Sequence, residues 1–263
     1  NNSTLVNDAG ATFSLMGDVG FNNVGGGTVS NAGTLVKSAG TGTANVVAAF
    51  DDTGVVQVSS GTLNLGGGGT AAGGAFTVAA GATLQFSNGL YNADSASPVT
   101  GSGTVLFSGG AANLAGPYNV GGATTATGGT ANLTGPVVAA GVVSASSGML
   151  NLGSSSLSIP SLSITVSGTL TGTGTVTVSG ATVWSGGYMT GTGTTIAQGG
   201  LTLGGNTAST NYSMYLQGGR TLRNSGAASF LISPSSGNVS TLTFYNNSTL
   251  VNDAGATFSL MGD

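Results

Sequence analysis

The feature that most constrains the fold is an Asn-Leu pair that returns at a constant interval in the middle of the chain. The three copies are Asn113-Leu114, Asn132-Leu133 and Asn151-Leu152. Recurrence at such an interval is typical of a β-solenoid, in which each coil lies on the equivalent residues of the coil below. Because side chains alternate along a strand, the leucines are expected to stack inside and the asparagines to form an external amide ladder. The alternative is a chance recurrence in a biased composition.

Short glycine-led segments recur along the whole chain at similar intervals. They begin at Gly10, Gly33, Gly61, Gly81, Gly103, Gly129, Gly148, Gly168, Gly193 and Gly219. A solenoid coil of two or three short strands needs about the length that separates these glycines. Segments such as 62–65 (TLNL) and 83–86 (TLQF) place apolar residues at period two, as half-buried strands do. Helical patterns of ~10–15 residues, which an α/β fold needs between its strands, do not appear. We therefore expect an all-β, right-handed parallel β-helix (β-solenoid).

A much longer period is also present. Residues 1–18 (NNSTLVNDAGATFSLMGD) and residues 246–263 are identical, at an offset of 245. We interpret residues 1–245 as one tandem-repeat unit of a continuous β-solenoid and residues 246–263 as the start of the next identical unit. With about 11 coils in a repeat unit and ~4.8 Å between stacked strands, one repeat unit should advance roughly 50 Å. Pro117 and Pro136 keep the spacing of the Asn-Leu pairs, so one corner is expected to recur in successive coils.

Composition excludes several function classes. Only 4% of the residues are charged, the net charge is −4, and there is no cysteine. Basic clusters are missing, so nucleic acid is not an expected partner. No apolar stretch approaches the ~18 residues of a membrane span. Without disulfides, stability has to come from the stacking of coils.

The sequence offers little catalytic chemistry. Histidine and cysteine are absent, and the acidic residues are well separated except for Asp51-Asp52. Glycoside hydrolysis needs two carboxyl groups on opposite sides of a bond, so a hydrolase would require Asp51, Asp52 and Asp94 to converge in one groove. We expect no catalytic residues, no metal site and no cofactor, and we interpret Asp51-Asp52 as part of a solvated loop.

Longer connections between strands are where binding chemistry would be displayed. The segments 88–102 and 204–218 are the candidates, and Tyr91, Tyr188, Tyr212 and Tyr215 lie in or near them. These tyrosines are candidates for a glycan-binding or packing surface.

The segments 61–69 (GTLNLGGGG), 81–86 (GATLQF), 101–110 (GSGTVLFSGG) and 169–180 (TLTGTGTVTVSG) support a family resemblance. The chain resembles the Gly/Ser/Thr-rich β-helical repeat regions of large bacterial surface proteins, such as filamentous-haemagglutinin-type adhesins and autotransporter passengers. The resemblance covers nearly all of the chain and is largely compositional. It implies a secreted right-handed β-helix at the cell surface, used for adhesion or as a fibre shaft. These families share no catalytic residues that could be carried over.

Three function hypotheses follow. The first is a structural protein that forms an extracellular or cell-surface filament, a fibre shaft, by end-to-end stacking of identical tandem units; lateral bundling with like fibres or with glycans stays open. The alternative is a surface adhesin that binds glycan or another cell through loops 88–102 and 204–218. The second alternative is a polysaccharide-degrading β-helix enzyme.

Overall fold

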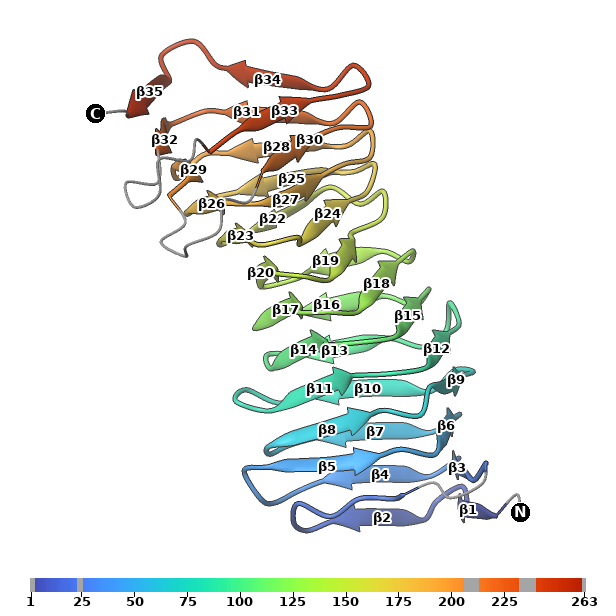
Figure 1. Ribbon diagram of the computed structural model, residues 1–263. Coiled ribbons are helices and arrows are strands. Elements are labelled where there is room, and N and C mark those ends of the chain that lie inside the picture. Colours follow the sequence, from blue (N-terminus) through green and yellow to red (C-terminus); the bar gives the residue numbers. More distant parts are fainter. Residues whose placement is uncertain (1–2, 23–25, 206–212, 232–239, 262–263) are drawn as a thin grey trace. The chain divides into compact units, whose positions relative to one another are not determined.

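A computed structural model describes residues 3–22, 26–205, 213–231 and 240–261 of the chain. Across these residues the secondary structure consists of short strands, and no helix is found. The chain divides into two compact units, a first unit of residues 1–140 and a second unit of residues 141–263. Each is described by itself below, and its strands are labelled in Figure 1.

The first unit contains three parallel sheets. Its first sheet is β1 (Thr4–Asn7), β3 (Thr28–Asn31), β6 (Ala49–Asp52), β9 (Gly69–Ala71), β12 (Leu90–Ala93), β15 (Ala111–Leu114) and β18 (Thr130–Leu133). Its second sheet is β2 (Thr12–Leu15), β4 (Thr34–Lys37), β7 (Val55–Val58), β10 (Ala75–Val78), β13 (Val99–Gly101), β16 (Tyr118–Val120) and β19 (Val137–Ala139). Its third sheet is β5 (Thr43–Val46), β8 (Thr62–Leu65), β11 (Thr83–Phe86), β14 (Thr104–Phe107) and β17 (Ala123–Ala126).

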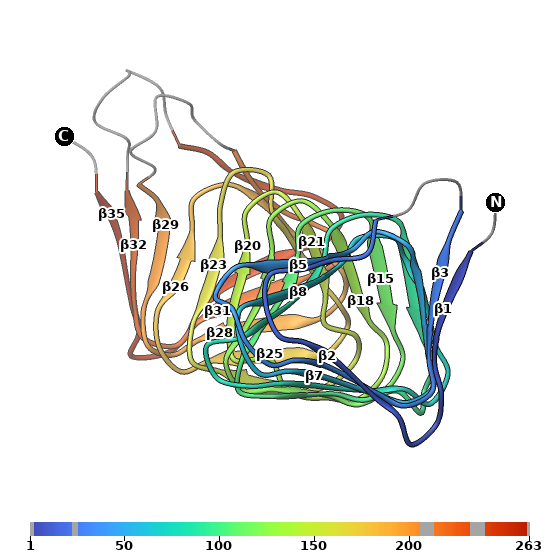
Figure 2. The same ribbon diagram turned by 90° about the horizontal axis from the view of Figure 1, so that it is seen from below.

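Consecutive strands of the first unit turn from one sheet to the next, and every third strand returns to the same sheet. Viewed end-on in Figure 2, β15 and β18, β2 and β7, and β5 and β8 lie on three sides of the coil. In the lowest coil the place of a third strand is taken by Phe21, which forms an isolated parallel bridge with Val46. Main-chain hydrogen bonds therefore run from coil to coil, along the stacking direction.

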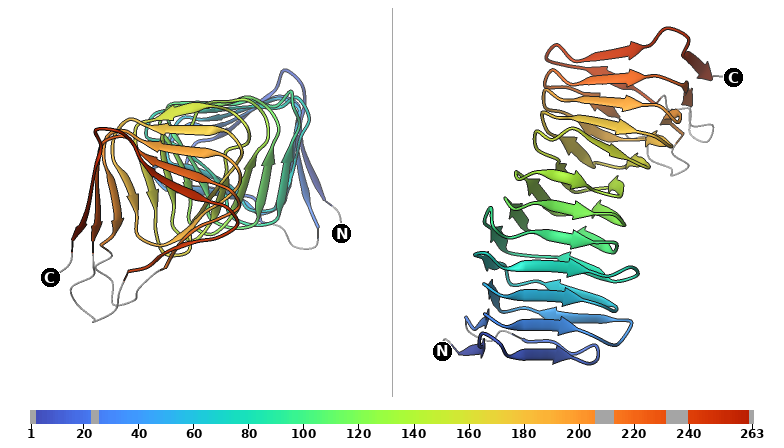
Figure 3. Two further views of the ribbon diagram at one scale, coloured as in Figure 1. Left: turned by 90° about the horizontal axis from the view of Figure 1, so that it is seen from above. Right: turned by 180° about the vertical axis from the view of Figure 1, so that it is seen from behind.

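The second unit repeats this arrangement. Its first sheet is β21 (Met149–Asn151), β24 (Thr169–Thr171), β27 (Gly187–Met189), β30 (Met214–Leu216) and β33 (Leu242–Phe244). Its second sheet is β22 (Leu157–Ile159), β25 (Thr175–Val178), β28 (Thr194–Ala197), β31 (Thr221–Asn224) and β34 (Thr249–Asn252). Its third sheet is β20 (Val142–Ala145), β23 (Leu162–Ile164), β26 (Thr182–Trp184), β29 (Leu201–Gly204), β32 (Ala227–Leu231) and β35 (Thr257–Met261). Figure 3 shows these strands from two further sides.

The fold class expected from the sequence is confirmed, because the described strands form stacked parallel sheets with the connectivity of a β-solenoid. Five full turns separate β3 from β18 in the first unit, and four separate β21 from β33 in the second. The count of about nine turns is slightly lower than the expected 11. Coil length also varies: the register partners Tyr188 and Tyr215 are further apart in the sequence than the partners Asn113 and Asn132.

The core consists of columns of apolar side chains that repeat from coil to coil. In the third sheet of the first unit, Leu63, Leu84 and Val105 are register partners and are buried. The intervening positions, such as Asn64 and Gln85, point outward and are half-buried. This alternation is the period of two that the sequence predicts for these strands.

Corners are formed by residues that a strand interior does not accept. Pro117 and Pro136 directly precede β16 and β19, so the predicted recurring corner is present. Their carbonyl oxygens accept the main-chain N–H groups of Val99 and Tyr118 from the neighbouring coils, at 3.0 and 2.9 Å. Gly101 ends β13 with a φ of 127°, and a Cβ there would lie 2.0 Å from the carbonyl oxygen of Val78. Glycine is required at this corner for both reasons.

Aromatic stacking extends one of the core columns, and it yields a test of the fold. Phe86 and Phe107 are register partners whose rings stack at a centroid distance of 5.5 Å. Phe107→Ala should lower the free energy of unfolding by about 3–5 kcal/mol, since it removes a buried ring and leaves a cavity. Val138→Ala, at a side chain that is 65% exposed, is the matched control and should change it by less than ~0.5 kcal/mol. Denaturant unfolding followed by circular dichroism measures both, and equal effects would contradict this core.

Candidate functional site

An outward amide ladder runs along the first sheet of the first unit. Asn113 and Asn132 are register partners, and Nδ2 of Asn132 donates to Oδ1 of Asn113 at 2.8 Å. Nδ2 of Asn113 in turn donates to Oδ1 of Asn92 at 2.8 Å. The ladder therefore begins one coil earlier than the sequence predicts. Asn151 lies in the second unit, where its Oδ1 accepts the N–H of Gly153 at 3.0 Å.

The three leucines next to these asparagines are all buried. Leu114 and Leu133 are register partners in the first unit. Leu152 is buried in the second unit and donates its N–H to the carbonyl of Thr171 at 3.1 Å. These residues are structural: the asparagines stabilise the outer face and the leucines the core.

The expectation that Tyr91 lines a surface is wrong, because its side chain is only 1% exposed. The register of β12 pairs Tyr91 with the buried Ala112 of β15, so its side chain points inward. There its ring meets Phe86 at a centroid distance of 5.2 Å and Phe76 at 6.1 Å. Its hydroxyl donates to the carbonyl of Thr70 at 3.2 Å, so the buried polar end has a partner. Burial also raises the pKa of Tyr91 well above its usual value.

Tyr188 and Tyr215 lie together on the outer face of the second unit. They are register partners in β27 and β30, with rings stacked at 4.9 Å and 15°. Tyr245, just after β33, continues the row at 6.2 Å from Tyr215 and is 51% exposed. We call these three residues the tyrosine row. Sequence reasoning missed Tyr245, although its separation from Tyr215 is similar to that between Tyr215 and Tyr188. Tyr212 lies outside the described residues.

The two segments expected to be loops both contain strand residues in the part that the structure describes. Residues 88–102 contain β12 and β13, and only 94–98 connect them. Asp94 closes that connection, because its Oδ1 accepts the Ser97 hydroxyl at 2.7 Å and the N–H groups of Ala96 at 3.0 Å and Gly73 at 3.1 Å. These bonds hold the pKa of Asp94 below its usual value. In the segment 204–218, residues 206–212 lie outside the described part, and 214–216 form β30.

Asp51 and Asp52 lie on opposite faces of β6. Asp51 points outward, where its Oδ1 accepts the hydroxyl of Thr70 at 2.8 Å. Asp52 points inward and is 1% exposed. The expectation that the pair forms a solvated loop is therefore wrong for both residues, which belong to a strand. Glycoside hydrolysis needs two carboxyl groups that flank a common space, and the carboxylates of Asp51 and Asp52 do not have this arrangement.

Asp52 ends an inner polar column of the first unit. Nδ2 of Asn7 donates to Oδ1 of Asn31 at 2.7 Å, and Nδ2 of Asn31 donates to Oδ1 of Asp52 at 2.7 Å. Asn7, Asn31 and Asp52 occupy the last, inward position of β1, β3 and β6, respectively. A polar residue at the fourth place of TLVN, TVSN and AFDD was the sequence signal for this column. Oδ2 of Asp52 has no hydrogen-bond partner among the described residues, and burial raises the pKa of Asp52 to about 6.

Both units also bury a cation. The Lys37 ammonium is 3.0 Å from Oδ1 of Asp18 and also donates to the carbonyl of Ala39. This bond holds the pKa of Asp18 below its usual value. In the second unit, Arg220 is 1% exposed.

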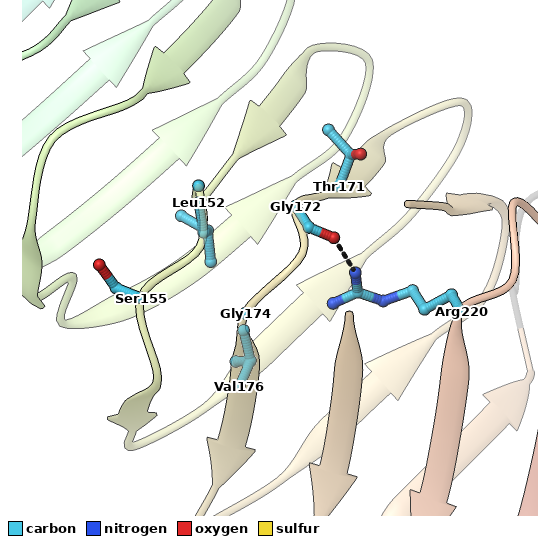
Figure 4. A pocket seen from close by; sticks show the side chains of 8 residues that line it. Leu152, Ser155, Thr171, Gly172, Gly174, Val176 and Arg220 are labelled. Atoms are coloured by element: carbon cyan, nitrogen blue, oxygen red, sulfur yellow. Dashed lines mark hydrogen bonds between the residues drawn. The ribbon is translucent and has the colours of Figure 1, made fainter. Parts of the chain in front are cut away.

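The Arg220 guanidinium ties neighbouring coils of the second unit together. It donates to Oγ1 of Thr195 at 2.9 Å, to the carbonyl of Thr190 at 2.9 Å and to that of Gly172 at 3.4 Å. Figure 4 shows the guanidinium pointing at Gly172 beside Thr171, in a small pocket that Leu152, Ser155, Gly174 and Val176 also line. Burial lowers the pKa of Arg220 to about 10, so it stays charged at neutral pH. The bonds to neighbouring coils indicate a structural role.

No group of residues able to hold a metal ion occurs among the described residues. In the same part of the chain, no helix is long and apolar enough to cross a membrane. Comparisons of the chain with protein-family models, curated proteins and solved structures gave no match. The fold nevertheless places it in a class, the parallel β-solenoid repeat proteins.

Asp52 gives the structure a specific pH dependence. Its folded pKa of about 6 lies above the unfolded value near ~4, so between these pH values the folded protein keeps a proton that the unfolded chain has lost. The free energy of unfolding should therefore be highest at the acidic end of this window and fall as pH rises through it. Asp52→Asn should remove this fall and stabilise the protein at pH 7 by on the order of 1–3 kcal/mol.

Urea unfolding at several pH values measures this effect. Asp51→Asn is the matched control, since it removes the same charge from the outer face of the same strand and should leave the fall in place. An unchanged slope in Asp52→Asn would contradict the assignment.

Proposed function

We propose that the chain is part of an extracellular or cell-surface filament, a fibre shaft built by end-to-end stacking of tandem β-solenoid repeat units, each equivalent to residues 1–245. The observation that carries this proposal is the identity of residues 1–18 and 246–263. Both copies form strands in stacked sheets: β1 and β2 in one copy, β34 and β35 in the other. A repeat unit whose first residues and whose continuation both form strands of a stacked sheet can be followed by a further repeat unit through the same strand pairing.

The bonding of the coils supports a structural role. Within each unit, main-chain hydrogen bonds join neighbouring coils, and columns of apolar side chains fill the interior. In repeat proteins of this type, stability is approximately the sum of the intrinsic stability of each repeat and the contacts between neighbouring repeats, so the fold can be lengthened without a new core. The strands β33, β34 and β35 each have a neighbour on one side, and strands of this kind accept another strand.

The outer surface is consistent with the same role. The three basic residues are Lys37, Arg220 and Arg223, and the first two are buried. Outward strand positions carry mostly Thr, Ser and Asn, as in β25. A surface of this kind lets neighbouring fibres approach without strong charge repulsion, which supports the expectation of lateral bundling.

Electron microscopy and fibre diffraction of a chain of several complete repeat units test this proposal. We expect elongated particles whose length increases by a constant amount per repeat unit, with an axial repeat near ~4.8 Å. Compact particles whose largest dimension does not grow with the number of repeat units would refute it. Phe107→Ala in each repeat unit, which weakens the core, should shorten or fragment the particles.

Adhesion is the second candidate, and the tyrosine row favours it. The row lies on an outer face, and aromatic rings with a polar edge are common in contact surfaces. Residues 88–102 offer this candidate a shorter loop than expected, since β12 and β13 lie within the segment and only 94–98 connect them.

Tyr188→Ser combined with Tyr215→Ser tests the adhesive role. If the row contacts glycan, the variant should lose at least tenfold in binding to immobilised neutral polysaccharide, because two stacked rings are removed while the main-chain pairing is kept. Thr169→Ser, at the register partner of Tyr188, is the control. Unchanged binding by the double variant would rule out the row as the contact surface.

A further inference from the structure

We propose that the recurring segment of residues 1–18 and 246–263 is the joint between successive repeat units, held by residues 220–226 of the preceding repeat unit, and that each repeat unit begins one sheet further round the coil than the last. The partner of this surface is a second copy of the same repeat unit. The inference rests on the proposed filament and assigns its contacts.

The first strand and the turn after it have the same local structure in the two copies of the segment. Residues TLVN form β1 in one copy and β34 in the other. The following turn has glycine at a positive φ in both, 81° at Gly10 and 84° at Gly255. In both, the N–H three residues after the aspartate bonds to its carbonyl, at 2.9 Å for Asp8 and 3.0 Å for Asp253. The segment therefore behaves as one preformed element in two surroundings.

The copies use different main-chain atoms toward their neighbouring coils. In the first copy the carbonyls of Ser3, Asn7, Ala11 and Leu15 accept N–H groups from the following coil, at 2.8–3.1 Å. In the second copy the N–H groups of Thr249, Asp253 and Thr257 donate to the preceding coil, each at 3.0 Å.

Subtracting the offset of 245 places those three donors at positions 4, 8 and 12 of the segment, whereas the acceptors are at positions 3, 7, 11 and 15. Odd positions thus face the following coil and even positions the preceding one, as the alternation of a parallel strand requires. One copy can therefore bond on both sides at once, with no atom used twice.

Side chains at the two copies complete the same joint. Nδ2 of Asn224 donates to Oδ1 of Asn252 at 2.7 Å. Asn252 corresponds to Asn7, whose Nδ2 donates to Asn31 at 2.7 Å. Joined through the shared asparagine, these bonds continue the inner polar column from one repeat unit into the next. Beside it, the guanidinium of Arg223 is 2.6 Å from Oδ1 of Asp253, the counterpart of Asp8.

Burial agrees with a following coil above the second copy. Leu15 is 2% exposed, whereas its counterpart Leu260 is 76% exposed. In the first copy Leu15 is paired on one side with Lys37 of the next coil. Equivalent residues of a following repeat unit would cover Leu260 in the same manner.

The step between repeat units follows from the strand count. Strands succeed one another in threes, so that β3 and β33 are both first strands of a coil. The first copy of the segment pairs with β3 and β4, as a first and a second strand. The second copy pairs with β31 and β32, as a second and a third strand. The repeat unit is therefore not a whole number of coils, and three repeat units are needed before the segment returns to its starting sheet.

Disulfide cross-linking of the complete chain tests the joint, since the chain has no cysteine of its own. Thr221→Cys with Thr249→Cys places thiols at register partners on the outer face of β31 and β34. Neighbouring strands bring Cα atoms within the ~4.4–6.8 Å that a disulfide spans. We expect nearly complete cross-linking under mild oxidation. Thr194→Cys with Thr249→Cys is the control, because β31 separates the two strands and the pair should not cross-link.

Cross-linking of the second pair instead of the first would overturn the proposal, as would the absence of both cross-links in folded protein. A charge exchange gives an independent measure: Arg223→Asp should lower the midpoint of thermal unfolding, and adding Asp253→Arg should restore it. If the second substitution does not restore the midpoint of thermal unfolding, the result contradicts the joint.

If the 221–249 cross-link forms but chains of several repeat units are compact in the microscope, the filament proposal is refuted and the joint proposal is retained. If rods form without that cross-link, the filament proposal is retained and the joint proposal is refuted.

Discussion

The constraint on which the structure depends is the in-register pairing of parallel strands from coil to coil. Register fixes which residues lie above one another, so an inward residue in one coil determines what the next can accommodate. The column of Leu63, Leu84 and Val105 shows the result for apolar residues, and that of Asn7, Asn31 and Asp52 shows it for polar ones. A buried amide is tolerated because the residue one coil away completes its hydrogen bonds.

This constraint explains how much the sequence reveals. Repetition from coil to coil and alternation within each segment are direct products of stacking, so the fold class was predictable from segments such as 62–65 and 83–86. The pairing of Asn113 with Asn132 followed from the same periodicity. The number of turns was predicted only approximately, because coil length varies along the chain.

The candidate site was harder to predict, since it depends on the register of each strand with its neighbours. Tyr91 stands among turn-forming residues in the sequence, but its pairing with the buried Ala112 directs it into the core. Asp52 follows an apparently equivalent Asp51, and only the alternation of β6 separates a buried carboxyl group from an exposed one. Shifting the register of a strand by a single residue reverses such assignments, and a short segment without clear apolar alternation does not fix its register.

The inner polar column has a direction. Asn224 donates to Asn252, Asn7 donates to Asn31, and Asn31 donates to Asp52, so these three inward amide bonds all point toward higher residue numbers. Asp52, whose ionised carboxylate can only accept, closes the series. An assembly built on such bonds is polar: its two ends differ chemically, and an inverted copy would oppose donor to donor. A head-to-tail contact of this kind joins two different surfaces, so in the proposed filament every repeat unit would have the same orientation along the fibre.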